Sequence, residues 1–214
     1  MENMSLVHSF FFFCIKLLGD IMLIISNGGI TSCNTADTMD AIMLTKNASF
    51  LDGVKLDVRE SLDNKLILSK YELLDELTLS TGRVSDYSYD YLKKVRFPSH
   101  IFKYFIPSLE DVLKRYNPNK IIALELFNME NNYEYLDNLY KLLSQYPYQY
   151  IFLVDEELIS GMNKEKMEML GKIILKKDAK YINDENDLTI LNKSDIVITD
   201  IPLKVYKYVN NRQK

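Results

Sequence analysis

The sequence predicts an α/β fold, a (β/α)8 barrel of the TIM type, from three observations. From residue 21 onward, short apolar segments alternate with amphipathic segments of helical period, the pattern of successive βα units. The apolar segments are continuous rather than alternating, as expected of parallel strands that are covered on both faces. There are eight of them, which is the number of strands in such a barrel.

Each element follows from its local pattern. The expected strands are the apolar segments at 21–26, 50–58, 65–70, 120–127, 150–154, 172–175, 180–183 and 195–199. Helices are expected where apolar residues recur with a period of 3.6, at 35–46, 108–116 and 130–145. Ser108 is a suitable N-cap for the second helix, and Pro147 ends the third.

The predicted barrel is compact. Residues 21–214 form one domain that is shorter than the ~250 residues typical of this fold. The shortage lies between 151 and 183, where two strands and any helices must share a short stretch. We therefore expect one or two abbreviated βα units in the C-terminal half.

Residues 1–20 form a separate apolar extension. The apolar run at 5–18 is shorter than the ~20 residues of a membrane span and contains His8 and Lys16. Its flanks lack the basic start and small-residue cleavage site of a secretory signal. Three interpretations stay open: a short helix that closes the bottom of the fold, an extension upstream of a natural start at Met22, or a membrane anchor. The first is favoured, and membrane association is not expected.

The amino-acid composition argues against several classes of function. The formal net charge is −4, with 47% hydrophobic and 26% charged residues, as in an ordinary soluble globular protein. The basic residues are interspersed with acidic ones, so nucleic-acid binding is not expected. Cys14 and Cys33 are too few for a metal quartet or a disulfide framework, which favours a reduced, cytoplasmic protein. The only histidines are His8 and His100, far apart in the sequence.

A series of short motifs runs through the domain in a fixed order. They are an apolar strand, a double-glycine turn and N-T at 21–35, strands at 52–58 and 65–71, T-G-R-V-S-D at 81–86, I-P-S-L-E-D-V-L at 106–113, a strand with a glutamate at 123–127, Y-I-N-D-E-N-D-L at 181–188, and D-I-V-I-T-D-I-P at 195–202. This order resembles the glycerophosphodiester phosphodiesterase family. The resemblance implies a barrel that cleaves a phosphodiester with two histidines, one after strand one and one after strand three. It also implies a divalent cation, Mg²⁺ or Ca²⁺, held by E-x-D on strand two and by the glutamate of E-x-K.

The catalytic positions depart from that pattern. Ser26 and Lys70 stand where the family has its two histidines, and Asn27 stands where it has an arginine. Cys33 replaces the glutamate that precedes N-T. A serine hydroxyl is not basic without a partner base, and a lysine acts as an acid near neutrality only if its pKa is strongly lowered. Catalysis by the family's route is therefore not expected.

The metal-binding positions depart as well. The E-x-D pair becomes Lys55 and Asp57, while Glu125 is kept and its companion lysine becomes Phe127. We expect no metal and no other cofactor, with Asp57 and Glu125 as remnant ligands. As a hypothesis, the ammonium of Lys55 stands where the cation stood and relieves the repulsion between these two carboxylates.

The candidate ligand-binding residues are therefore Ser26, Asn27, Lys55, Asp57, Lys70 and Glu125. Each has a purely structural alternative: the glycine turn at 26–29 needs only small residues, Lys55 with Asp57 and Glu125 forms a buried ion cluster, and Lys70 is a solvated strand end. Arg59 and Arg83 are within possible reach of a phosphate, but surface ion pairing is the favoured interpretation for both.

We therefore expect a non-catalytic protein that binds a phosphorylated, glycerol-type small molecule or a partner protein at the former active-site face. The alternatives are a weakly active or altered phosphodiesterase of glycerophospholipid metabolism, and a structural or regulatory subunit.

Overall fold

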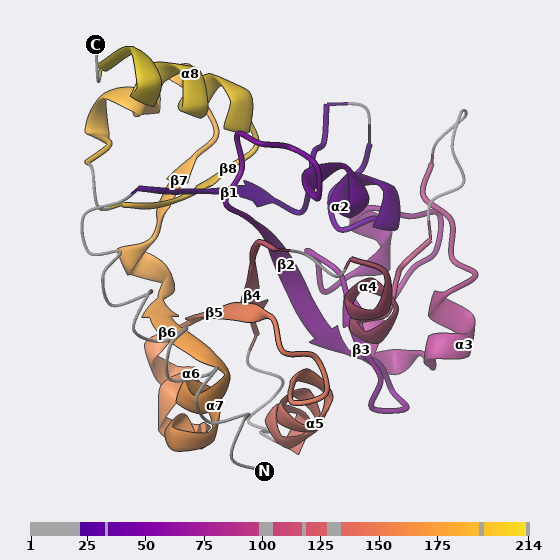
Figure 1. Cartoon of the computed structure of the whole chain (residues 1–214). Helices are drawn as coiled ribbons and strands as arrows, with labels where there is room; N and C mark the ends of the chain where they lie inside the picture. Colours follow the sequence, from indigo (N-terminus) through magenta and orange to yellow (C-terminus); the bar gives the residue numbers. More distant parts are fainter. Residues whose placement is uncertain are drawn as a thin grey trace.

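The protein is represented by a computed structural model, which describes residues 22–32, 34–98, 105–116, 119–127, 134–192 and 195–212 (Figure 1). The expectations for the apolar extension, Cys33 and His100 lie outside these ranges. None of the helices within them is long and apolar enough to cross a membrane.

All eight expected strands are present. They are β1 (Leu23–Asn27), β2 (Gly53–Glu60), β3 (Leu66–Leu68), β4 (Ile121–Leu126), β5 (Gln149–Val154), β6 (Gly171–Leu175), β7 (Lys180–Ile182) and β8 (Ile196–Thr199). Seven of them run parallel in the order β6-β5-β4-β2-β1-β8-β7. This sheet curls around itself, as expected for a barrel of the TIM type (Figure 1).

One strand differs from the parallel pattern. β3 is antiparallel to the C-terminal end of β2, with Val58 opposite Leu68, and β4 pairs directly with β2. The reason is the short connection: residues 61–65 suffice for a hairpin, whereas a parallel crossover needs a dozen residues or more. Within the described strands, no ladder joins β6 to β7.

The expected shortening in the C-terminal half is also observed. The connection between β6 and β7 consists of a 3-10 turn, Lys176–Asp178, and Ala179, and another 3-10 turn, Glu185–Ile190, follows β7 on the way to β8. Two further 3-10 turns, Leu74–Glu76 and Val84–Asp86, lie in the long segment after β3.

The three expected helices are present in shortened form as α2 (Met39–Thr45), α4 (Leu109–Tyr116) and α5 (Glu134–Leu143). α2 begins late because Thr38 is its N-cap and accepts a hydrogen bond from the backbone N of Ala41. The described part of the chain has four more helices, whose bounds were not predicted from the sequence: α3 (Tyr89–Leu92), α6 (Glu156–Gly161), α7 (Lys164–Leu170) and α8 (Pro202–Arg212).

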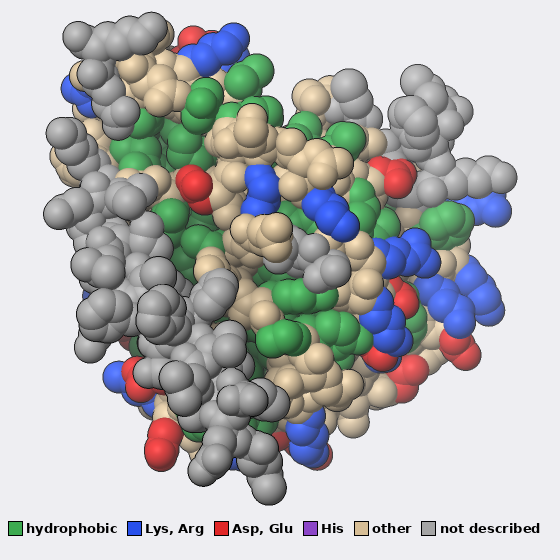
Figure 2. Space-filling model, in the orientation of Figure 1, with side chains coloured by type: hydrophobic (Ala, Val, Ile, Leu, Met, Phe, Trp, Pro, Cys, Tyr) green, Lys and Arg blue, Asp and Glu red, His purple; other side chains and the backbone are tan. Residues whose placement is uncertain are grey.

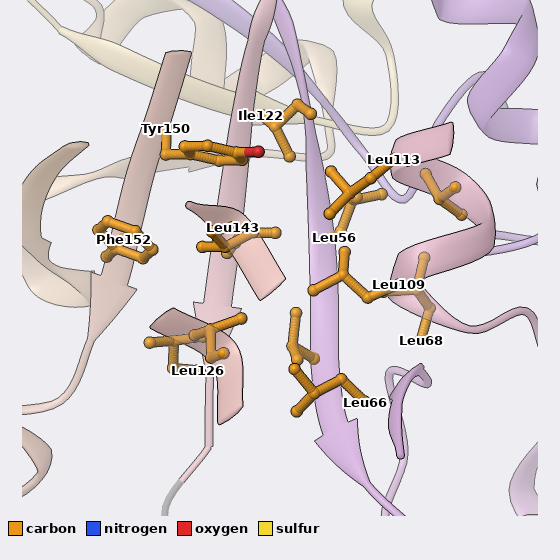
Figure 3. Close-up of a cluster of buried hydrophobic side chains, with 14 of the residues drawn as sticks. Leu56, Leu66, Leu68, Leu109, Leu113, Ile122, Leu126, Leu143, Tyr150 and Phe152 are labelled. Carbon is orange, nitrogen blue, oxygen red and sulfur yellow. The ribbon is translucent and has the colours of Figure 1, made fainter. Parts of the chain in front are cut away.

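Two apolar layers hold the sheet. On its outer face, Leu56 of β2 and Phe152 of β5 pack with residues of α4 and α5 such as Leu109 and Leu143 (Figure 3). Inside the curl, a second cluster comes almost entirely from the strands and includes Ile25, Ala123, Leu153 and Ile198. Towards the carboxyl ends of the strands, the inward positions become polar. This polar end is the mouth of the barrel, where ligand sites of such folds lie.

Candidate functional site

The register of three strands brings the polar side chains of the mouth together. Asn27 at the end of β1 is paired with Lys55 in β2, and Asp57 of β2 is paired with Glu125 in β4. Side chains alternate along a strand, so Lys55, Asp57 and Arg59 share one face of β2. That face points into the curl.

Lys55 is the centre of the mouth. Its Nζ lies 2.7 Å from both carboxylate oxygens of Asp57, 2.8 Å from Oε2 of Glu125 and 3.1 Å from Oδ1 of Asn27. The side chain is buried, with 3% of its surface exposed. An ammonium has three protons to donate, and these contacts use all of them.

Charge explains why this arrangement is stable. Burial lowers the pKa of Lys55, but the carboxylates of Asp57 and Glu125 outweigh burial and raise the pKa above its usual value. Lys55 is therefore a protonated counter-ion. Its ammonium lies between the carboxylates of Asp57 and Glu125, as expected from the sequence.

Glu125 connects Lys55 to the rim of the mouth. Its Oε1 lies 3.2 Å from Nζ of Lys176, and its Oε2 accepts a hydrogen bond of 3.3 Å from the hydroxyl of Tyr181. Lys176 also pairs with Asp155 at 2.9 Å. Burial raises the pKa of Glu125, but Lys55 and Lys176 together hold it below its usual value.

Lys176 and Tyr181 were not identified from the sequence. Lys176 directly follows β6, and its place at the carboxyl end of a parallel strand is a signal that could have identified it. Tyr181 lies within β7 and carries no comparable signal.

A third carboxyl group, that of Asp37, lies buried beside Asp57. Its Oδ1 is 3.4 Å from the backbone N of Asp57, its backbone has a φ of 58°, and Oδ2 has no hydrogen-bond partner among the described atoms. Burial, followed by the charge of Asp57, raises the pKa of Asp37 well above its usual value. The loop before α2 places it there, and nothing in the sequence pattern indicates it.

Arg59 lies further out on the same face of β2. Its Nε and Nη2 donate to the backbone carbonyls of Ser69 and Lys70, at 3.1 Å and 3.3 Å. Its guanidinium carbon is 4.1 Å from the ring centre of Phe127, and Nζ of Lys176 is 4.5 Å from the same centre.

The surface pairing expected for the two arginines holds for Arg83, whose Nε lies 3.4 Å from Glu72. For Arg59, no carboxylate lies within ion-pair distance among the residues that the structure describes.

Ser26 and Lys70 lie apart from this cluster. Ser26 is fully buried, its hydroxyl donates to the carbonyl of Gly53 at 3.4 Å, and strand alternation puts it on the opposite face from Asn27. Lys70 is exposed after β3, with its Nζ 5.5 Å from the ring centre of Tyr71. At the end of β1, the side chain that enters the mouth is therefore that of Asn27.

The double-glycine turn has a structural explanation. Gly28 and Gly29 have φ values of 65° and 102°, which side chains rarely allow. A Cβ on Gly29 would lie 2.4 Å from the carbonyl carbon of Ala41. The N–H of Gly28 already donates to the carbonyl of Lys55 at 2.9 Å, so it is not available to an anion.

The residues of the mouth do not fit a divalent cation. The two remnant carboxylates, Asp57 and Glu125, are both in contact with the ammonium of Lys55, and its positive charge would repel a metal ion at the same place. No group of three or more His, Cys, Asp or Glu side chains within the described ranges could hold one. The absence of a metal in the protein stays a prediction.

A separate surface groove lies between α2, α3 and α4, outside the curl. Lys93, Lys94 and Arg115 line it, and Figure 2 shows basic side chains gathered on the side where α3 and α4 lie. Asp40 and Asp111 line the same groove and offset part of that charge. The groove has no described contact with the mouth.

No protein-family model and no curated protein matches the sequence. Solved structures do match. The glycerophosphoryl diester phosphodiesterase domain of a Mycobacterium tuberculosis protein has 14% identity and a TM-score of 0.64, over 89% of this chain and 100% of that one. A glycerophosphoryl diester phosphodiesterase from Parabacteroides distasonis has 17% identity and a TM-score of 0.61, over 90% and 88%.

A third match is an Oleispira antarctica phosphodiesterase in complex with the product sn-glycerol-3-phosphate. It has 16% identity and a TM-score of 0.66, over 88% of this chain and 96% of that one. At such identities the likeness concerns the fold. The chain therefore has the fold of glycerophosphodiester phosphodiesterases, as its motifs led us to expect.

Proposed function

We propose that this protein, which has the fold of the glycerophosphodiester phosphodiesterases, does not hydrolyse phosphodiesters and instead binds a phosphorylated, glycerol-type small molecule at its mouth. The observation that carries the proposal is the position of Lys55, whose buried ammonium lies between Asp57 and Glu125. In this interpretation the ammonium of Lys55 stands in for the divalent cation that the family resemblance implies, and the protein is a pseudoenzyme.

The residues at the end of β1 and at the centre of the mouth are also poor proton carriers, which supports the same conclusion. A general acid or base works best when its pKa lies near the working pH. The pKa of Lys55 is raised away from neutrality, and Asn27 at the end of β1 cannot titrate. Ser26 faces away from the mouth, and its hydroxyl donates to a backbone carbonyl rather than to a base.

Ligand binding is supported by the groups that remain at the rim. Arg59 and Lys176 are partly exposed cations beside the ring of Phe127, and Tyr181 is a further polar group next to them. The Oleispira antarctica phosphodiesterase holds sn-glycerol-3-phosphate, the class of ligand that we propose here. We further propose that the protein acts in the cytoplasm.

Two measurements test this function. In calorimetry and thermal unfolding, sn-glycerol 3-phosphate should bind and raise the melting temperature, because a ligand that binds only the native state stabilises it. Glycerophosphocholine and bis(p-nitrophenyl) phosphate should not be turned over, with or without Mg²⁺ or Ca²⁺. Sustained turnover that is lost in Lys55→Met would show a weakly active enzyme. A lack of binding together with a stable hetero-complex in gel filtration would instead favour a subunit role.

A further inference from the structure

The three cations of the mouth differ in how their charges are balanced. Lys55 lies between Asp57 and Glu125, and Lys176 lies between Glu125 and Asp155. Arg59 is half-buried on the same face of β2 as Lys55, yet the described part of the chain places no carboxylate within ion-pair distance of it.

An unbalanced cation in a partly buried position is unfavourable. Burial lowers the pKa of Arg59 more than the surrounding carboxylates raise it. The largest opposing influence is that of Glu72, whose carboxylate already pairs with Arg83, followed by Asp57 and Glu125, which already pair with Lys55. A charge taken out of water without a partner costs free energy, which an anion can offset.

The guanidinium is also held in a fixed orientation. Two of its nitrogens donate to the carbonyls of Ser69 and Lys70, and its central carbon lies over the ring of Phe127, 4.1 Å from the ring centre. Stacking and hydrogen bonding of this kind pre-organise an arginine, which has five N–H groups, for bidentate contact with an oxyanion.

We propose that Arg59 is the residue that binds the phosphate group of the ligand, with Lys176 as the second cation beside the ring of Phe127. The inference rests on the proposed function and names the chemical class that the mouth selects, a phosphate monoester. Such a group carries about −1.5 to −2 charges at neutral pH and suits a bidentate guanidinium with a neighbouring ammonium. A free small molecule and a lipid headgroup both offer this chemistry.

The experiment measures phosphate binding by matched arginine variants. Inorganic phosphate and sn-glycerol 3-phosphate are titrated into the wild type, Arg59→Met, Arg59→Lys and Arg83→Met by calorimetry at constant ionic strength. Loss of a charge-assisted hydrogen bond should weaken binding about tenfold or more in Arg59→Met. Arg59→Lys should recover part of the affinity, since it keeps the charge but not the bidentate geometry. Arg83→Met, an exposed arginine paired with Glu72, should bind like the wild type.

The outcomes separate this inference from the proposed function. Equal binding by the wild type and Arg59→Met overturns the inference and leaves the function standing. If inorganic phosphate binds in an Arg59-dependent way and sn-glycerol 3-phosphate binds no more tightly than phosphate does, the inference is supported. Recognition of the glycerol part, and with it that element of the proposed function, is then overturned. No binding of either anion by the wild type overturns both.

Two additions complete the design. If Arg59→Met does not fold, the test uses Arg59→Lys alone. A phosphate affinity of Arg59→Lys equal to that of the wild type would then overturn the proposal that Arg59 makes a bidentate contact. Sedimentation with phosphatidylcholine vesicles that contain phosphatidic acid identifies the source, because only a lipid-borne phosphate gives Arg59-dependent sedimentation.

Discussion

Replacing Lys55 by methionine tests the central feature of the mouth. Methionine keeps much of the length of the side chain but removes the ammonium, which leaves Asp57 and Glu125 facing each other without a counter-ion. Asp57 and Lys55 are almost fully buried, with 1% and 3% of their surfaces exposed. Removing one partner of a buried ion pair typically costs about 3–5 kcal/mol.

That loss of stability is large enough to be measured by thermal unfolding. For a chain of this size, a loss of about 3–5 kcal/mol lowers the melting temperature by roughly 6–20 °C. The melting temperature is measured by circular dichroism at neutral pH. The matched control is Lys114→Met, which removes an exposed ammonium 2.6 Å from Glu110 one helical turn away. Exposed pairs of this kind contribute little to stability, because water and salt screen them.

The pH dependence gives a second, independent check. In the wild type, Lys55 and Lys176 hold the pKa of Glu125 down against the effect of burial. Without Lys55, burial raises that pKa, so the variant takes up a proton more readily and recovers stability relative to the wild type as the pH falls. A loss in Lys55→Met no larger than that in Lys114→Met, or one that is constant from neutral to acidic pH, would refute the idea that Lys55 is a buried counter-ion.

Three further predictions concern the same region. Calcium at millimolar concentration should raise the melting temperature of Lys55→Glu, because three carboxylates then converge at the mouth, and should leave the wild type unchanged; an equal shift in both proteins would contradict the role given to Lys55. Gly29→Ala should lose about 1–3 kcal/mol in chemical denaturation, since its φ is 102° and a Cβ would meet Ala41; an unchanged midpoint would show that the turn can relax. The lowered pKa of Glu125 stabilises the native state above the carboxyl group's ordinary pKa, and this stabilisation is lost as the pH falls through the native pKa. Acid titration of Glu125→Gln should therefore show a flatter loss of stability than the wild type, and parallel curves would contradict it.

Much of the fold could be predicted because apolar runs and turn residues are local signals. All eight strands and three of the helices lie close to their expected positions. The orientation of β3 was not foreseen, because an apolar run has the same appearance in a parallel and an antiparallel strand. The short helices α6 and α7 and the helix α8 were not assigned, since their apolar positions are few and their packing partners lie elsewhere in the chain.

For the site, the sequence identified the ion cluster but not its full membership. Asn27, Lys55, Asp57 and Glu125 come together as expected, because strand ends in parallel register meet at one edge. Ser26 and Asn27 are neighbours in β1, and the pleat of the strand places their side chains on opposite faces. The side chain of Asn27 enters the mouth, and that of Ser26 does not.

By itself, the sequence determined where the strands lie and that a lysine stands within the second strand, two residues before an aspartate. These properties depend on residue type and on short-range periodicity, both of which are readable along the chain. Only the tertiary structure decided that Asp37, Lys176 and Tyr181 join the mouth and that Arg59 lies there without a described counter-ion. Pairing and burial of charges depend on distances between segments that are remote in the chain, and only folding fixes those distances.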